Sequence, residues 1–338
     1  MGNFINNAPF ALVIVFLIIG FVLLIKGADF FVEGSSSVAK RLHVPSIIIG
    51  LTIVAMGTSL PETAVSVSAS ITGNNELAVS NVVGSNIFNL MVVIGVCAMI
   101  ATVNVAKETI KRDIPFSLIC AGLLLILGIL GVGDKSGMML GHFDGVIFIG
   151  AFAGYIFYMI KIALKASKEG KKVEIEGGSD EDIKLISVPL SILFIVGGAA
   201  AIAVGGDITV DAASRIASDL GMSQTLIGLT IVAIGTSLPE LVTSIVASKK
   251  GENDMALGNV IGSNIFNLLL VLGVAGTVSP IHLPNMESVI DCVILLVVSL
   301  LVFFIIKRTS IVGKKTGALM VLIYVVYTIY IFYRNYFM

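Results

Sequence analysis

Two stretches of thirteen residues, "GLTIVAMGTSLPE" at Gly50–Glu62 and "GLTIVAIGTSLPE" at Gly228–Glu240, differ at one position. A second pair, "NVVGSNIFNL" at Asn81–Leu90 and "NVIGSNIFNL" at Asn259–Leu268, lies at the same offset of 178 residues. Between the two regions that hold these motifs, about 31 of 48 aligned positions are identical without a gap. The chain therefore contains an internal repeat, and each copy places a proline and a glutamate inside an apolar stretch.

The composition identifies the chain as an integral membrane protein. Hydrophobic residues make up 57% of the chain, charged residues only 13%, and the mean hydropathy is +1.04. Soluble domains usually carry about a quarter charged residues. The net charge of −1 gives no reason to expect a nucleic-acid partner. The three cysteines, Cys97, Cys120 and Cys292, lie in apolar runs without metal-ligand spacing, so we expect them to be buried small hydrophobes.

Hydropathy predicts an all-α polytopic membrane protein with ten transmembrane helices. The expected spans are 9–32, 43–71, 77–103, 113–131, 142–164, 185–207, 222–248, 255–279, 286–306 and 316–333. The polar stretch 165–184 separates a first five-span repeat, 1–164, from a second, 185–338. Because five is an odd number, the second repeat must be inverted relative to the first. Inverted repeats are typical of transporters, whose binding sites lie near the bilayer midplane on interrupted helices. The alternative is a duplicated scaffold, but packing alone does not require two intact copies of these polar motifs.

Basic residues predict the orientation of the chain. With both termini outside, the inside connections carry about seventeen lysines and arginines, and the outside connections and tails carry only Lys135, Arg215 and Arg334. We therefore expect the loop 165–184 in the cytoplasm and both termini outside. Its acidic run, Ser179–Lys184, is expected to be a solvated linker.

The repeated Pro-Glu motif supplies oxygen ligands for a hard cation. Pro61 lacks an N–H and therefore leaves the carbonyl of Gly57 without its helical partner; the second copy repeats this arrangement. Such carbonyls are tolerated at membrane depth only where they line a cavity or are otherwise satisfied. Thr58 and Glu62 are four residues apart and share one helical face. Hydroxyl, carbonyl and carboxylate oxygens without thiolate or imidazole favour hard cations.

The second motif adds polar side chains at the same spacing. Ser85 and Asn89 are four residues apart, as are Ser263 and Asn267. We interpret these four as cation ligands, with interhelical hydrogen bonding as the alternative. The remaining asparagines of the motif, Asn86 and Asn264, point elsewhere on the helix, and we expect them to bond across helices.

The two intramembrane glutamates, Glu62 and Glu240, are the strongest functional signal. No basic residue in the same spans offers a partner, and two ionised carboxylates facing each other are costly to bury. A divalent cation, several monovalent cations or protons would neutralise them. The empty, doubly charged site should resist crossing a closed barrier, whereas the loaded site can be occluded. This charge balance predicts obligate exchange.

On these motifs the chain resembles the calcium/cation antiporter superfamily, and most closely prokaryotic sodium/calcium exchanger-like proteins. The resemblance covers essentially the whole chain and implies four cation sites at the midplane. By motif position it implies that Glu62 and Glu240 bind both Ca²⁺ and Na⁺. It gives the remaining ligand positions as Thr58, Thr236, Ser59, Ser237, Ser85, Ser263, Asn89, Asn267, Ala55 and Ala233, with the threonines and alanines acting through their backbone carbonyls.

The resemblance also indicates the transported ions and the motion. Potassium-dependent members carry aspartate where Asn267 stands, so K⁺ co-transport is not expected. Proton-coupled relatives often carry a G-N-x-x-E pattern that this chain lacks, which favours Na⁺ over H⁺ as the counter-ion. The family's motion slides the first and sixth spans across the rest, and Gly27 and Gly205 at the ends of these spans fit that role or ordinary packing.

The sequence thus predicts an antiporter that exchanges Ca²⁺ for Na⁺ in a prokaryotic cell membrane, without a cofactor or an obligate protein partner. A Ca²⁺/H⁺ antiporter of the same fold is the main alternative, and a cation channel is a remote one. An intramembrane enzyme is disfavoured because no nucleophile–base constellation accompanies the glutamates. Asp29 and Asp207, at matching positions, are expected to cap or contact water rather than to bind the ions directly.

Overall fold

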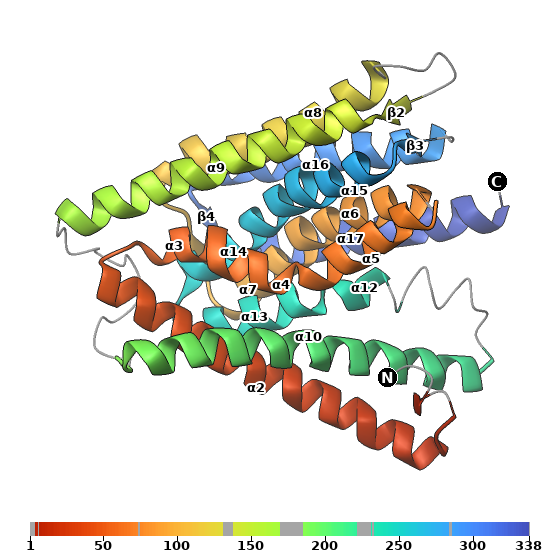
Figure 1. Cartoon of the computed structure of the whole chain (residues 1–338), viewed down its shortest axis with the longest axis horizontal. Coiled ribbons are helices and arrows are strands. Elements are labelled where there is room, and N and C mark those ends of the chain that lie inside the picture. The colour runs from red at the N-terminus through yellow and green to blue at the C-terminus, as the bar shows by residue number, and fades with distance from the viewer. Residues whose placement is uncertain are drawn as a thin grey trace.

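The computed structural model is an all-helical bundle in which most helices run along one common direction (Figure 1). It describes residues 4–5, 7–73, 75–130, 138–169, 185–221, 231, 233–283 and 286–337. Most of the central polar stretch, from residue 170 to 184, lies outside these ranges, so the acidic run predicted as a linker is not described. Within the described residues, eight helices are long and apolar enough to cross a membrane, and a bent pair of helices forms a ninth candidate.

The long helices follow the order of the expected spans. They are α2 (Phe10–Leu42), α6 (Asn75–Phe88) continued by α7 (Ile94–Ile100), α8 (Ile114–Leu130), α9 (His142–Glu169), α10 (Val188–Asp219), α14 (Asn253–Phe266) continued by α15 (Leu272–Val278), α16 (Met286–Thr309) and α17 (Lys314–Phe337). Short π-helical turns, η2 (Asn89–Val93) and η5 (Asn267–Val271), join α6 to α7 and α14 to α15, and η3 (Thr109–Asp113) precedes α8.

The bent pair contains the first Pro-Glu motif. Helix α3 (Ser46–Ile49), the π-helical turn η1 (Gly50–Val54) and α4 (Ala55–Thr58) form its first part, and α5 (Leu60–Ile71) forms its second. The two parts meet at Ser59 with a bend of 50°. The second motif has the same break at Ser237, between α12 (Ala233–Thr236) and α13 (Leu238–Lys249). The beginning of the expected span 222–248 lies outside the described residues. The predicted interruption of both helices by proline is confirmed.

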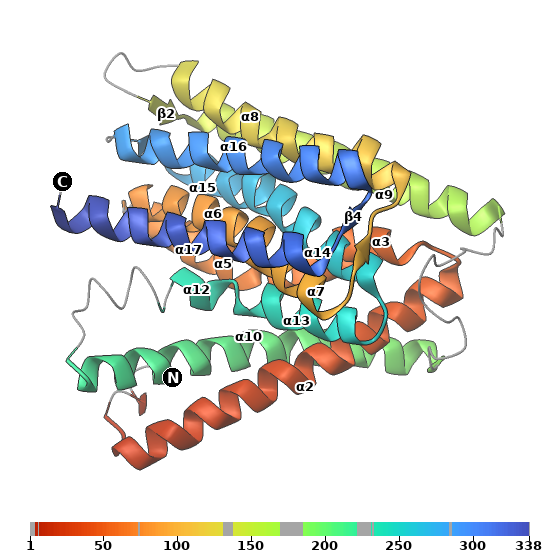
Figure 2. The same ribbon diagram turned by 180° about the vertical axis from the view of Figure 1, so that it is seen from behind.

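Two short strand pairs show the inversion of the repeats directly. β1 (Val103–Asn104) pairs with β4 (Ile311–Val312), and β2 (Met138–Leu140) pairs with β3 (Ile281–Leu283), both antiparallel. β1 and β3 follow the third span of the first and second half respectively, and each pairs with a strand from the other half. The two pairs lie at opposite ends of the bundle (Figure 2). Equivalent strands at opposite ends are the expected result of turning one half upside down.

Helices α2 and α10 are much longer than predicted. The first and sixth spans were expected to end at residues 32 and 207, but the helices continue to Leu42 and Asp219 and contain 33 and 32 residues. At 1.5 Å per residue each is about 50 Å long, well beyond a hydrocarbon core of about 30 Å. Their polar ends, such as Ser35–Ser37, read as a loop in a hydropathy profile although they continue the helix. The expected ends at Gly27 and Gly205 were therefore wrong, because both glycines lie well inside the helices.

Glycines hold α2 and α10 together along one face of the bundle (Figure 1). A Cβ added to Gly27 would lie 2.9 Å from the amide nitrogen of Ile202, and one added to Gly205 would lie 2.8 Å from that of Leu24. Small residues allow this close approach of two backbones in a membrane. The tight packing indicates that the two helices behave as one unit.

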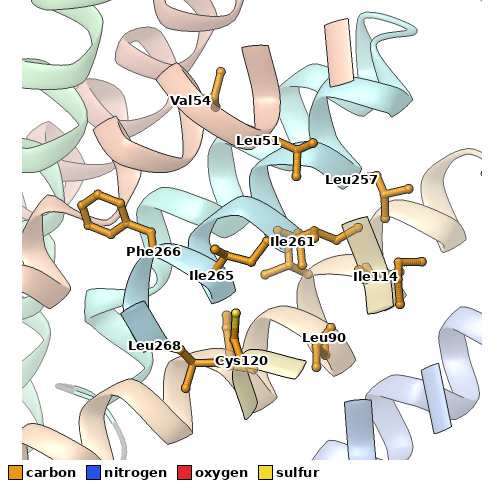
Figure 3. Close-up of a cluster of buried hydrophobic side chains, with 14 of the residues drawn as sticks. Leu51, Val54, Leu90, Ile114, Cys120, Leu257, Ile261, Ile265, Phe266 and Leu268 are labelled. Carbon is orange, nitrogen blue, oxygen red and sulfur yellow. The ribbon is translucent and has the colours of Figure 1, made fainter. Parts of the chain in front are cut away.

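The apolar core lies on the other side of the broken helices and is centred on α14. Figure 3 shows Ile261 and Ile265 of α14 between Leu51 of η1 and Cys120 of α8. Cys97 and Cys292 are also buried and free, so the prediction of three buried small hydrophobes is confirmed. The core therefore fixes α14 against the bent helix that carries the first motif.

The contact between α2 and α10 predicts a sharp difference between neighbouring glycines. We expect Gly198→Ala to lower the midpoint of thermal unfolding of the detergent-solubilised protein, because its Cβ would lie 2.7 Å from the carbonyl oxygen of Gly27 and 2.8 Å from the amide of Phe31. Overpacking of this kind costs about 1–3 kcal/mol. Gly197→Ala is the matched control, since a Cβ there meets nothing within 4 Å. Equal midpoints for the two variants would contradict the packing.

Candidate ion-binding site

Both glutamates of the repeated motif lie at the beginning of a helix. Glu62 is in the first turn of α5 and Glu240 in the first turn of α13, directly after the breaks at Ser59 and Ser237. Both side chains are 0% exposed. The positive end of a helix dipole stabilises a carboxylate in this position. Proline has two effects here: it ends the preceding helix, and it is tolerated in the first turn of the next one.

Serines from each half bond to the glutamate of the other half. Ser59 Oγ donates to Glu240 Oε1 at 2.8 Å, and Ser237 Oγ donates to Glu62 Oε1 at 3.2 Å. Ser263 Oγ lies 3.3 Å from Glu240 Oε1, and Ser237 Oγ lies 2.9 Å from Ser85 Oγ. The structure therefore brings together the predicted serines and both glutamates in one buried polar cluster between the two halves.

Four buried oxygen atoms of the predicted ligand side chains have no hydrogen-bond partner. They are Glu62 Oε2, Glu240 Oε2, Asn89 Oδ1 and Asn267 Oδ1. The two glutamates are 178 residues apart, and so are the two asparagines, which is the offset of the repeat. Among the described residues, no other buried side-chain atoms that lack a partner are related by this offset. Buried polar atoms are normally bonded, because an unpaired one costs free energy. Carboxylate and amide oxygens are donors of the kind that a hard cation prefers.

The glutamates also lack a positive partner inside the protein. Among the residues that the structure describes, neither Glu62 nor Glu240 forms an ion pair with lysine, arginine or histidine. The carboxylates of this buried site are therefore left for a bound cation or protons to neutralise, as the sequence predicted.

Two asparagines hold the helix breaks in place through hydrogen bonds. They were not singled out in the sequence analysis. Asn259 Nδ2 donates to the backbone carbonyl of Glu240 at 3.4 Å, and its Oδ1 accepts from Thr58 Oγ1 at 3.0 Å. Asn81 makes the equivalent contacts, with the Glu62 carbonyl at 3.4 Å and with Thr236 Oγ1 at 3.3 Å. Both residues open the quoted second motif, so their identity in the two repeats was the available signal.

The remaining predicted ligands each lie at the beginning of a short helical segment. Ala55 begins α4, and its carbonyl already accepts from the amide of Ser59 at 3.1 Å. Ala233 begins α12 in the second half. Asn89 and Asn267 begin the π-helical turns η2 and η5. Such turns widen a helix locally and are frequent at functional sites.

A cavity of about 650 Å³ lies against the broken helices. It lies between α5, α10 and the α12–α13 break, and its wall includes Pro61, Pro239 and Thr236. Asp207 and Asp211 of α10 also line it.

The two repeat-related aspartates, Asp29 and Asp207, and the histidines His43 and His142 form no hydrogen bond with Glu62 or Glu240 in the described part of the chain. Asp29 forms an ion pair with Lys250, whose Nζ lies 2.8 Å from Asp29 Oδ1, a contact that the sequence did not reveal. Asp207, at the matching position, lines the cavity. His43 caps the end of α2, and His142 begins α9 with its Nδ1 2.8 Å from the carbonyl of Thr277.

Comparison with known proteins assigns the family. The profile of the family "Sodium/calcium exchanger protein" matches residues 12–161 and 190–333. The chain belongs to the sodium/calcium exchanger family. It is therefore a multi-pass membrane antiporter for cations and not an enzyme.

Individual members of the family are similar over most of their length. The chain is 42% identical to the putative antiporter CaxA of Alkalimonas amylolytica over 79% of this chain and 81% of that protein. It is 32% identical to the sodium/calcium exchanger MaX1 of Methanosarcina acetivorans, covering 94% and 97% of the two chains. A structure of the sodium-calcium exchanger NCX_Mj soaked with Na⁺ and Sr²⁺ superposes with a TM-score of 0.79 at 32% identity, covering 94% of this chain and 98% of that one.

The helix breaks lead to a prediction about cation binding by this family member. We expect Pro61→Ala to weaken Ca²⁺ binding by at least about tenfold, because alanine supplies the N–H that closes the helix onto the Gly57 carbonyl and moves Glu62. Titration calorimetry on the purified protein measures this. Pro189→Ala at the start of α10 is the control, since proline is tolerated there and its loss should leave the affinity unchanged. A Pro61→Ala protein with unaltered Ca²⁺ affinity would refute the role of the break.

Proposed function

We propose that the chain exchanges Ca²⁺ for Na⁺ across a prokaryotic cell membrane by alternating access. One observation carries this proposal: the four buried oxygens without partners, on Glu62, Glu240, Asn89 and Asn267, come in repeat-related pairs. Carboxylate and amide oxygens are the ligands that Ca²⁺ prefers. Na⁺ is likewise a hard cation that uses the same kind of donor.

The proposed ligand set draws equally on both halves of the chain. The two glutamates are shared by Ca²⁺ and Na⁺, and the two asparagines border the central position. Thr58 and Thr236 contribute their backbone carbonyls. The flanking Na⁺ positions use Ser59, Ser237, Ser85, Ser263 and the backbone carbonyls of Ala55 and Ala233. The proposed repeats are 1–164 and 185–338, joined by the linker 165–184. Neither half has a complete set, so the ions bind only where the two repeats meet.

Charge balance accounts for the coupling of the two ions. With both carboxylates ionised, the site carries two negative charges that are costly to occlude in a membrane without a cation. One Ca²⁺ neutralises them, and so do two Na⁺. A loaded site passes the barrier and an empty one does not, so inward movement of one ion requires outward movement of the other. A channel would need no counter-ion.

The basic residues of the connections orient the protein in the membrane. Both termini and the β2–β3 pair lie outside, and the loop 165–184 lies in the cytoplasm. The cavity lined by Asp207 and Asp211 lies against the broken helices, and we propose that it is part of the path by which ions reach them.

The exchange is tested in proteoliposomes. We expect Ca²⁺ uptake into vesicles loaded with Na⁺ and none into vesicles loaded with choline, because the occluded site must return loaded. Glu240→Gln removes one of the two charges and should abolish uptake, whereas Glu108→Gln makes the same chemical change at an exposed residue and should not. Uptake driven by a pH gradient alone would replace Na⁺ with H⁺ as the counter-ion. Uptake without any counter-ion would refute exchange.

The same vesicles test independence from K⁺. Asn267 is uncharged where potassium-dependent members carry aspartate, so the site lacks the additional carboxylate of those proteins. We expect the initial rate of Na⁺-driven uptake to be the same with K⁺ and with choline as the background cation. A rate that rises several-fold with K⁺ would contradict the proposed ion set.

Surface labelling tests the orientation. Leu220, directly after α10, is 77% exposed and is predicted outside, and Ile311, in β4, is 44% exposed and is predicted inside. In intact cells a membrane-impermeant maleimide should label Leu220→Cys and not Ile311→Cys. The native cysteines give a low background because all three are buried. The reverse labelling pattern would invert the proposed topology.

A further inference from the structure

Two asparagines outside the proposed ligand set form a reciprocal pair between α6 and α14. Asn86 Nδ2 donates to the backbone carbonyl of Asn264 at 3.2 Å, and Asn264 Nδ2 donates to the backbone carbonyl of Asn86 at 3.2 Å. Both side chains are buried. This confirms the expectation that the two residues bond across helices, and it also fixes the direction of their amides.

The direction of each amide follows from the chemistry of its partner. A backbone carbonyl oxygen only accepts hydrogen bonds, so each side chain must turn its NH₂ group toward that carbonyl. The oxygen of each amide then faces the opposite way. Asn264 Oδ1 accepts from Asn89 Nδ2 at 3.2 Å, and Asn86 Oδ1 accepts from Asn267 Nδ2 at 3.1 Å.

The same logic orients the next two amides. Because Asn89 and Asn267 meet oxygen atoms, they must present their NH₂ groups to them, and their own oxygens face away. Those oxygens, Asn89 Oδ1 and Asn267 Oδ1, are buried and without a partner. Each residue lies one helical turn beyond the serine of the same motif, on the helix face that carries that serine. The two unpaired oxygens therefore belong to the face that contributes to the polar cluster.

The geometry points to Asn86 and Asn264 as positioning residues that make Asn89 and Asn267 present oxygen, and not NH₂, to the transported cation. This inference rests on the proposed function. The donor end of an amide would repel a cation where the carbonyl end attracts it, so an unconstrained amide would be a poor ligand. A backbone carbonyl can only accept a hydrogen bond, so it fixes the orientation of the first amide. That amide in turn fixes the orientation of the second, whose oxygen then faces the cation.

Each of the two positioning asparagines orients the ligand asparagine of the opposite repeat. Asn264 of the second half orients Asn89 of the first, and Asn86 of the first half orients Asn267 of the second. Loss of the Asn264 side chain leaves the backbone carbonyls in place, so Asn86 and, through it, Asn267 keep their orientation. The two chains of hydrogen bonds are therefore separable by mutation.

A double-mutant cycle on the purified full-length protein tests the pairing, with Ca²⁺ affinity measured by titration calorimetry. We expect Asn264→Ala to weaken Ca²⁺ binding by about tenfold or more, as loss of an outer partner does at metal sites. In a protein that already carries Asn89→Ala, the same change should have little further effect, because the amide it orients is gone. In a protein that carries Asn267→Ala, it should retain its full effect. Asn86→Ala with Asn267→Ala provides the reciprocal cycle if Asn264→Ala does not fold.

The outcomes separate this inference from the proposed function. Coupling of Asn264 with Asn89 and independence from Asn267 would support it, because a general loss of packing would weaken binding equally in both backgrounds. Equal effects in both backgrounds, or an unchanged affinity in Asn264→Ala, would overturn the inference while Ca²⁺ binding by the unmodified protein still stood. Absence of Ca²⁺ binding by the unmodified protein would overturn both.

Discussion

The structure depends on two carboxylates, Glu62 and Glu240, that are buried in the membrane interior without a basic partner in the described part of the chain. Burying a charge is unfavourable unless something neutralises it, and each glutamate keeps one oxygen without a hydrogen bond. The neighbouring helix ends and serines stabilise these buried carboxylates. Proline breaks place each carboxylate at a helix N-terminus, and serines of the opposite half bond its other oxygen. We propose that the transported ions neutralise these carboxylates.

The inverted repeat makes such a site from one short sequence used twice. Each half supplies one glutamate, and Ser59 and Ser237 each bond to the glutamate of the opposite half, so the cluster lies at the interface between the halves. Helices α2 and α10 form a glycine-packed pair against the broken helices, while α14 is held in the apolar core (Figure 3). A pair packed on itself is suited to move across the broken helices as one body. A cavity lies between α10 and α5, next to the broken helices.

Much of the fold and of the site was predictable because the repeat is so well preserved. The spans, the inversion and the helix breaks followed from hydropathy, an odd span number and proline chemistry. The polar character of Glu62, Glu240, Ser85 and Ser263 followed from residue spacing within the two motifs, whereas Ser59 and Ser237 were expected only from the family resemblance. The length of α2 and α10 did not follow, because their polar ends leave the hydrocarbon region, where hydropathy no longer reports helix. The contacts of Asn86 with Asn264, and of Asp29 with Lys250, join residues far apart in sequence and needed the three-dimensional register.

The central claim is that the four unpaired oxygens of Glu62, Glu240, Asn89 and Asn267 surround one cation. Crystals of the protein soaked with Sr²⁺, measured at a wavelength where strontium scatters anomalously, test it most directly. The account predicts a single strong anomalous peak within about 2.3–2.8 Å of these oxygens, which weakens as Na⁺ in the soak rises. A peak confined to another part of the molecule, or one at this position that Na⁺ does not displace, would contradict it.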